Sequence, residues 1–107
     1  MARIYSKLLG RLLLSTVPTA AFTVPTGHVY VVKWLTTYVT SSGQFVECVH
    51  RAPGPVDFTV ESTALGGAFS SLNVERHWML NNGDSLLCYA FVANSVYLSL
   101  YGYDLLA

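Results

Sequence analysis

The chain has 107 residues, which is enough for one domain with a modest core and leaves no room for a second domain. Six basic and six acidic residues cancel, so no excess of positive charge is present to attract nucleic acid. Charged residues make up 11% of the chain, against roughly 25% in an ordinary soluble domain, and hydrophobic residues make up 52%. Because so little charge cannot cover the surface of a small domain, we expect much of that surface to contact other protein or a bilayer, with assembly with other subunits favoured.

The first 17 residues are basic and leucine-rich. Cations before an apolar run resemble a secretory signal, but the run at residues 12–14 is only three leucines long. Leucines four residues apart would share a helical stripe, yet Gly10 interrupts the segment. We therefore expect an N-terminal arm or edge strand over residues 1–17, followed by a sandwich domain over residues 18–107. No run approaches the roughly 18–20 apolar residues of a membrane span.

Short runs of β-branched and aromatic residues, separated by glycine and proline, predict an all-β chain. Residues 20–24 lie between two prolines and predict an edge strand. Residues 28–39 predict the longest strand, and both of its faces are apolar, as in a central strand with one face against a second sheet and the other against a neighbouring subunit. Strict alternation would place one set of residues together on one face: Tyr30, Val32, Trp34, Thr36 and Tyr38.

Further strands are predicted at residues 45–51, 56–62, 72–80, 85–92 and 96–106. In the second of these segments the alternation predicts an apolar face and a polar face. The inward set is Val56, Phe58 and Val60, and the outward set is Asp57, Thr59 and Glu61. Seven or eight strands at roughly ten-residue spacing, with no convincing helix, predict a single antiparallel β-sandwich of the jelly-roll type.

The stretch "LNNGDSLL" at residues 80–87 contains Gly-Asp-Ser-Leu, the nucleophile signature of a large hydrolase family. Those enzymes take their base from a later Asp-x-x-His, but here no such motif follows Ser85 and the last histidine, His77, precedes it. Asn82 and Gly83 instead predict a hairpin turn, with Asp84 bonding to local amides, and Gly27 predicts a second turn.

The remaining reactive side chains form no pattern that indicates catalysis. His28, His50 and His77 are isolated on different predicted strands, without the spacing that brings two nitrogens to one metal ion. We therefore expect no catalytic residue, no metal and no cofactor, and we predict that the protein is not an enzyme. Cys48 and Cys88 lie in apolar runs, as buried thiols or as a disulfide between facing strands.

Three tyrosines, Tyr97, Tyr101 and Tyr103, share one face of the last predicted strand. Such a row suits a subunit interface, because tyrosine buries a large area and keeps a hydroxyl for hydrogen bonding. Ordinary packing and stacking on a sugar ring are the alternatives. The candidate interface residues are Tyr97, Tyr101, Tyr103, Tyr30, Trp34, Leu12 and Leu13.

The chain resembles the small β-sandwich virion proteins of tailed bacteriophages in a series of short segments. The series begins with "KLLG" at residues 7–10 and continues with "FTVPTGHVYVVKWL" at residues 22–35. It ends with the pattern Trp78-x-Leu80-x-x-Gly83-Asp84-x-Leu86 and with "SVYLSLYGYDLL" at residues 95–106. The family patterns are of the type "tVPaGk-vVvk", "W-x-L-x-PGDtL" and "vdvsvsGyeL". This chain has Asn82 where the family has proline, which makes the turn less rigid.

The resemblance implies a structural component of the virion, assembled in the host cytoplasm, with copies of itself and other virion proteins as partners. Minor tail protein is the favoured role, and capsid decoration or a head-tail position is the alternative. A carbohydrate-binding module that attaches to host-surface glycan is the hypothesis from another class. No catalytic residue is carried over from the family.

Overall fold

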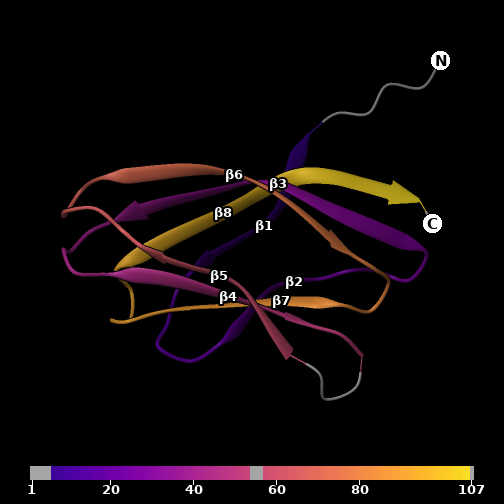
Figure 1. The fold of residues 1–107 in the computed structure, drawn as a ribbon, viewed down its shortest axis with the longest axis horizontal. Coiled ribbons are helices and arrows are strands. Elements are labelled where there is room, and N and C mark those ends of the chain that lie inside the picture. The colour runs from indigo at the N-terminus through magenta and orange to yellow at the C-terminus, as the bar shows by residue number, and fades with distance from the viewer. Residues whose placement is uncertain (1–5, 54–56, 107) are drawn as a thin grey trace.

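The computed structural model describes residues 6–53 and 57–106, and the regular structure in those ranges consists of strands. The strands are β1 (Lys7–Leu13), β2 (Thr19–Thr23), β3 (His28–Val39), β4 (Phe45–Arg51), β5 (Asp57–Ala64), β6 (Ser71–Leu80), β7 (Ser85–Ala90) and β8 (Val96–Leu106). They form two four-stranded antiparallel sheets, which lie as two layers in Figure 1. The expected β-sandwich is confirmed. No helix in the described ranges could cross a membrane.

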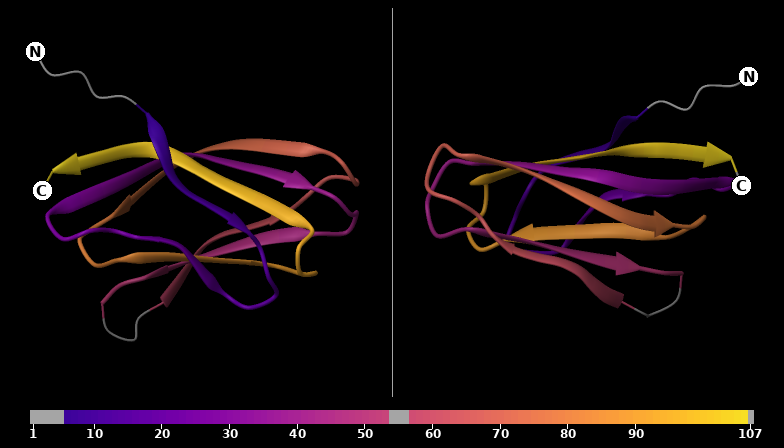
Figure 2. Two further views of the ribbon diagram at one scale, coloured as in Figure 1. Left: turned by 180° about the vertical axis from the view of Figure 1, so that it is seen from behind. Right: turned by 45° about the horizontal axis from the view of Figure 1, so that its top comes forward.

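The order of the strands makes the sandwich a jelly roll. Sheet 1 has the order β1-β8-β3-β6, and sheet 2 has the order β2-β7-β4-β5. The first strand pairs with the last, the second with the seventh, the third with the sixth and the fourth with the fifth. The chain is thus one long antiparallel ribbon, and the pairing of β3 with β8 and of β4 with β7 rolls it into two layers (Figure 2).

The core lies between the two sheets. Along β8 every second residue points inward, and Val96, Leu98 and Leu100 are fully buried. Each buried leucine or valine contributes roughly 1.5–3 kcal/mol through loss of apolar surface. The other buried core residues come from both sheets and from the segments between strands: Leu14, Phe22, Val24, Val32, Leu35, Val39, Val46, Cys48, Leu65, Leu80, Leu86, Cys88 and Ala90.

A β-bulge in β3 corrects the expected faces of the central strand. The pairing with β8 skips Lys33, so Val32 lies opposite Gly102 and Trp34 lies opposite Tyr101. An extra residue shifts the alternation by one position. Before the bulge the inward residues are Tyr30 and Val32, and after it they are Leu35, Thr37 and Val39. The prediction of one face running from Tyr30 to Tyr38 is therefore wrong, because strict alternation cannot anticipate a bulge.

Gly102 makes the bulge possible. A Cβ atom at this position would lie 1.9 Å from the carbonyl oxygen of Val31 and 3.0 Å from the amide nitrogen of Lys33. Both are backbone atoms, so no side-chain rotation could relieve the contact. Only glycine allows β8 and β3 to approach this closely.

The predicted faces of β5 hold for Asp57 and Thr59, which are exposed, and fail at two other positions. Phe58, expected inside, is 59% exposed, whereas Glu61, expected outside, is 6% exposed. The pairing with β4 skips Val60, and this bulge shifts the alternation so that Glu61 lies opposite the buried Cys48. Val60 does pack against the core, and Val56 lies outside the described residues.

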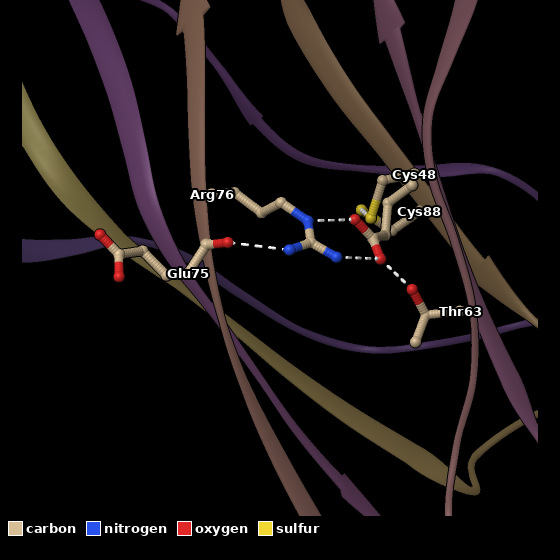
Figure 3. A network of polar contacts seen from close by, with 6 residues as sticks. Cys48, Thr63, Glu75, Arg76 and Cys88 are labelled. Carbon is tan, nitrogen blue, oxygen red and sulfur yellow. Dashed lines mark hydrogen bonds and ion pairs between the residues drawn. The ribbon is translucent and has the colours of Figure 1, made fainter.

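The buried Glu61 carboxylate is paired across the sandwich. Arg76 of β6 donates from Nε to Oε1 at 2.6 Å and from a terminal nitrogen to Oε2 at 3.0 Å, and the Thr63 hydroxyl also donates to Oε2 (Figure 3). Since β5 and β6 are edge strands of opposite sheets, this forked ion pair joins the two layers. A carboxylate taken out of water needs such bonds to offset its lost hydration.

Cys48 and Cys88 lie directly opposite each other on β4 and β7, beside this ion pair (Figure 3). Both are buried free thiols, and their Sγ atoms lie 3.2 Å apart in a hydrogen bond. This hydrogen bond, and then burial, hold Cys48 in its protonated form and raise the pKa of its thiol far above the usual value. Of the two alternatives left open by the sequence, the structure contains the buried thiols.

The turn between β6 and β7 is present, but it is not a hairpin. β6 belongs to sheet 1 and β7 to sheet 2, so the segment crosses between layers. The Asp84 amide donates to the Asn81 carbonyl at 2.9 Å, and the Asp84 carboxylate accepts from the Asn81 amide at 2.9 Å. Gly83 has a φ of 85° and Gly27 a φ of 83°, which are left-handed values that favour glycine. Asn82 lies within this turn.

Substitution of Gly102 tests the close approach of β8 to β3. We expect Gly102→Ala to lower the free energy of unfolding by about 2 kcal/mol or more, because the added methyl group forces the two backbones apart. Gly67→Ala is the matched control, since its Cβ would meet no atom within 4 Å, and its effect should stay within about 0.5 kcal/mol. Urea denaturation measures both, and equal midpoints for the two variants would contradict this account of the bulge.

The buried thiols should be unreactive in the folded protein. We expect iodoacetamide at pH 8 to leave Cys48 and Cys88 unmodified for hours, because both side chains are buried and a raised pKa keeps the thiolate fraction of Cys48 very low. Intact-mass spectrometry should show both alkylated once urea unfolds the chain. Thr19→Cys, at an exposed edge position, serves as the reactive control. Rapid alkylation of the folded wild-type protein would refute the assigned burial and pKa.

Candidate interaction surface

The outer face of sheet 1 collects exposed aromatic and aliphatic side chains. Residues directly opposite each other in an antiparallel sheet share a face, so the strand register defines its rows. Leu13, Tyr97 and Tyr38 form one row across β1, β8 and β3, and the two tyrosine rings lie 6.3 Å apart. Leu8, Tyr101 and Trp34 form a second row across the same strands.

A third row extends the apolar surface toward β6. It contains Tyr103, Val31 and Met79, and the Met79 side chain is 64% exposed. Together the three rows define what we call the sheet 1 outer face: Leu8, Leu13, Val31, Trp34, Tyr38, Met79, Tyr97, Tyr101 and Tyr103. So many large apolar side chains on one sheet face are unusual for a surface that only meets water.

Polar side chains cross this face in a row of their own. Arg11 Nε donates to the Ser99 hydroxyl at 3.3 Å, and the Thr36 hydroxyl donates to Asn73 Oδ1 at 2.9 Å. These bonds hold the side chains in place within the sheet. Glu75 lies opposite Trp34 on β6, and Lys33 Nζ lies 3.7 Å from Glu75 Oε1, so charged groups border the apolar rows. A partner of this face must therefore match polar and charged groups as well as apolar area.

The structure places five of the seven predicted interface residues on the sheet 1 outer face: Trp34, Leu13, Tyr97, Tyr101 and Tyr103. Leu12 and Tyr30 instead face the interior and pack against the core, where the Tyr30 ring lies 5.1 Å from that of Phe22. The bulge at Lys33 separates Tyr30 from the face of Trp34. Leu12 faces inward because it is adjacent to Leu13, and neighbouring residues of a strand point to opposite faces.

Sequence reasoning missed four residues of the face: Leu8, Val31, Tyr38 and Met79. The sequence pattern places Tyr38 on the same strand face as Trp34, and this could have identified Tyr38 as an interface residue. Leu8 and Val31 required knowledge of the bulges, and Met79 required the pairing of β6 beside β3.

A charged cluster anchors the edge of this sheet. Asp104 of β8 accepts from His28 Nδ1 of β3 at 2.5 Å and from Lys7 Nζ of β1 at 2.9 Å. The His28 bond, and then the Lys7 bond, hold the pKa of the Asp104 carboxyl below its usual 3.8. The cluster ties β1 to the sheet, and β1 supplies Leu8 and Leu13 to the outer face.

The other histidines also have carboxylate neighbours. His50 Nε2 lies 2.8 Å from the Asp84 carboxylate, and His77 Nε2 lies 3.5 Å from that of Glu75. In residues 6–53 and 57–106 no three His, Cys, Asp or Glu side chains gather as a metal site, and no pocket is found there. The Ser85 hydroxyl lies 2.9 Å from that of Thr23 and is not hydrogen-bonded to a histidine in the same ranges.

No protein-family model and no curated protein matches the chain. Among solved structures, similar chains are found in two crystal structures of a pentameric capsid protein isolated from metagenomic phage sequences. Each is 17% identical, with a TM-score of 0.46 and coverage of 94% of this chain. The chain spans about three fifths of that protein's length, 59% in one structure and 60% in the other.

The Asp104 cluster should make stability depend on pH in acid. A carboxyl whose pKa is lowered by folding stabilises the fold above its unfolded pKa, and this contribution disappears as pH falls through the folded pKa. We therefore expect Asp104→Asn to be less stable than wild type between pH 4 and 6 and equally stable near pH 2. Urea midpoints measure the difference. Asp57→Asn, which removes an exposed pair with Arg51, should show a smaller effect. A difference that is constant with pH would argue against the cluster.

Proposed function

We propose that the protein is a non-enzymatic structural subunit of a tailed-phage virion, and we favour the role of a minor tail protein. It acts by packing its sheet 1 outer face against a neighbouring virion protein. The motif resemblance of residues 22–35 and 95–106 supports the class of protein. Jelly rolls also occur in lectins and cupins, so the fold by itself does not select the role. The apolar sheet face is the observation that carries the proposal.

The composition of this face suits a specific protein contact. Trp34 and the tyrosines supply large rigid side chains, which are enriched among the residues that dominate binding energy. A standard specific interface buries about 1,600 Å² in total, and many copies in a particle strengthen such contacts by avidity. The bonds from Arg11 to Ser99 and from Thr36 to Asn73 hold part of the polar row in place, so docking has fewer side chains to order.

Complementation of a phage that lacks the gene tests the role. We expect wild-type protein to be incorporated into particles and Trp34→Glu with Tyr97→Glu to be incorporated at least tenfold less, because two charges would be buried in the contact. Quantitative mass spectrometry of purified particles gives the copy number. Phe58→Glu, at a more exposed aromatic position on sheet 2, is the control and should be incorporated normally.

The location of the protein in the same particles distinguishes the tail role from the head roles and from the alternative functions. Gold-labelled protein on the tail supports the favoured role, and label on the head supports capsid decoration or a head-tail position. Protein absent from purified particles contradicts the virion role. Binding of the free protein to a glycan array, abolished by Trp34→Ala, would instead support the carbohydrate-binding hypothesis.

A further inference from the structure

One end of the sandwich is formed by four connecting segments, residues 14–18, 40–44, 65–70 and 91–95. They follow β1, β3, β5 and β7, and three of them gather at the left of Figure 1. Backbone hydrogen bonds tie neighbouring segments together: the Asn94 amide donates to the Leu14 carbonyl at 3.0 Å, that of Thr40 to Ser95 at 2.9 Å, and that of Leu65 to Gln44 at 2.9 Å. We call this surface the loop end.

The loop end contains no charged residue and no histidine in any of its four segments. The charge clusters lie elsewhere, and the opposite end carries three of them. Asp104 with His28 and Lys7, Asp84 with His50, and Asp57 with Arg51 are all at that opposite end. Within the described residues, charges are thus absent from the loop end and form three clusters at the opposite end.

Large apolar side chains project from this uncharged surface. Val17 is 64% exposed, Phe69 72%, Phe91 66% and Val92 50%, and they come from three of the four segments. Phe69 also has a φ of 60°, a left-handed conformation that is rare for a bulky residue. The Phe69 amide donates to the Val39 carbonyl at 2.7 Å, so the loop holds this strained residue in place with its ring outward. Strain and exposure both cost stability, which is the pattern of a functional site.

We propose that the loop end is a self-association surface at which copies of this chain meet around a shared rotation axis. In such an arrangement each copy brings the same end to the axis, so any charge there would face its own like charge. The uncharged loop end avoids that repulsion, whereas the opposite end would bring several buried or paired charges together. Identical partners therefore fit this surface better than they fit any other end of the molecule.

The loop end is also preorganised for docking. Its segments bond to one another, and Gln44, which is buried, accepts from the Val92 amide at 3.1 Å and donates to the Ser41 hydroxyl at 3.2 Å. Association then orders few additional side chains and leaves few polar groups unpaired. A lipid surface is the less suitable occupant, because apolar tips that enter bilayers are normally flanked by lysine or arginine that contacts the headgroups.

Sedimentation velocity of the full chain over a hundredfold concentration range tests the proposal. We expect an average mass above the 11.7 kDa monomer that rises with concentration. Phe91→Glu should raise the dissociation constant at least tenfold, because it places like charges at the axis. Phe69→Asn should weaken association as well, while relieving the left-handed strain that asparagine tolerates. Thermal melting confirms that both variants fold.

Matched controls identify the surface. Phe58→Asn and Leu106→Glu alter exposed apolar residues far from the loop end and should associate like wild type. A wild-type chain that remains monomeric at every concentration overturns the proposal. So does association that survives Phe91→Glu but is lost in the Trp34→Glu variant of the sheet 1 outer face. Binding of monomeric protein to phosphatidylcholine vesicles, with or without phosphatidylserine, that Phe91→Glu abolishes overturns it in favour of lipid.

The proposal and the virion role can fail separately. Self-association through the loop end in a protein that is absent from particles would leave this proposal standing and remove the proposed function. Conversely, a protein that is monomeric in solution, and whose incorporation into particles depends on Trp34 and not on Phe91, would support the proposed function and overturn self-association through the loop end.

Discussion

The close approach of Gly102 to the backbone of Val31 is the constraint on which the rest of sheet 1 depends. It admits the bulge at Lys33, and the bulge lets β3 bury Val32 on one side of it and Leu35 on the other. The same shift turns Trp34 outward to lie beside Tyr101. One glycine thus allows a single strand both to complete the core and to present the aromatic surface, which an unbroken alternation of this sequence could not do.

The jelly-roll connectivity gives the two ends of the sandwich different stabilising interactions. The first strand pairs with the last, the second with the seventh, and so on toward the middle of the chain. This pairing brings the segments after β1, β3, β5 and β7 to one end of the sandwich and the other connecting segments to the opposite end. Charged pairs that join strands far apart in sequence, such as Lys7 with Asp104, lie at the second end. The first end is held by backbone hydrogen bonds instead and remains uncharged. Stability therefore comes from different interactions at the two ends, and this leaves one of them free for apolar contact.

The two layers are joined by more than hydrophobic packing. Arg76 and Glu61 connect the edge strands β6 and β5 across the sandwich, beside the paired thiols of Cys48 and Cys88. A buried ion pair adds little net stability, but an inward carboxylate without its partner would be very costly. The pair thus disfavours any register of β5 or β6 that separates the two side chains.

Composition and local pattern were sufficient to predict the all-β class, the strand positions, the turns and the tyrosine row of β8, because these depend on neighbouring residues and on a period of two. The faces of β3 and β5, the inward position of Tyr30 and Leu12, and the crossing turn at Gly83 were not predictable in this way. Each depends on which strands become neighbours, and on bulges that form where those neighbours meet. The sequence by itself determined that the chain forms strands, and that it has much apolar and little charged surface to distribute among them. Only the tertiary structure decided where that surface lies, because a one-residue shift in pairing moves every following side chain to the opposite face of the sheet.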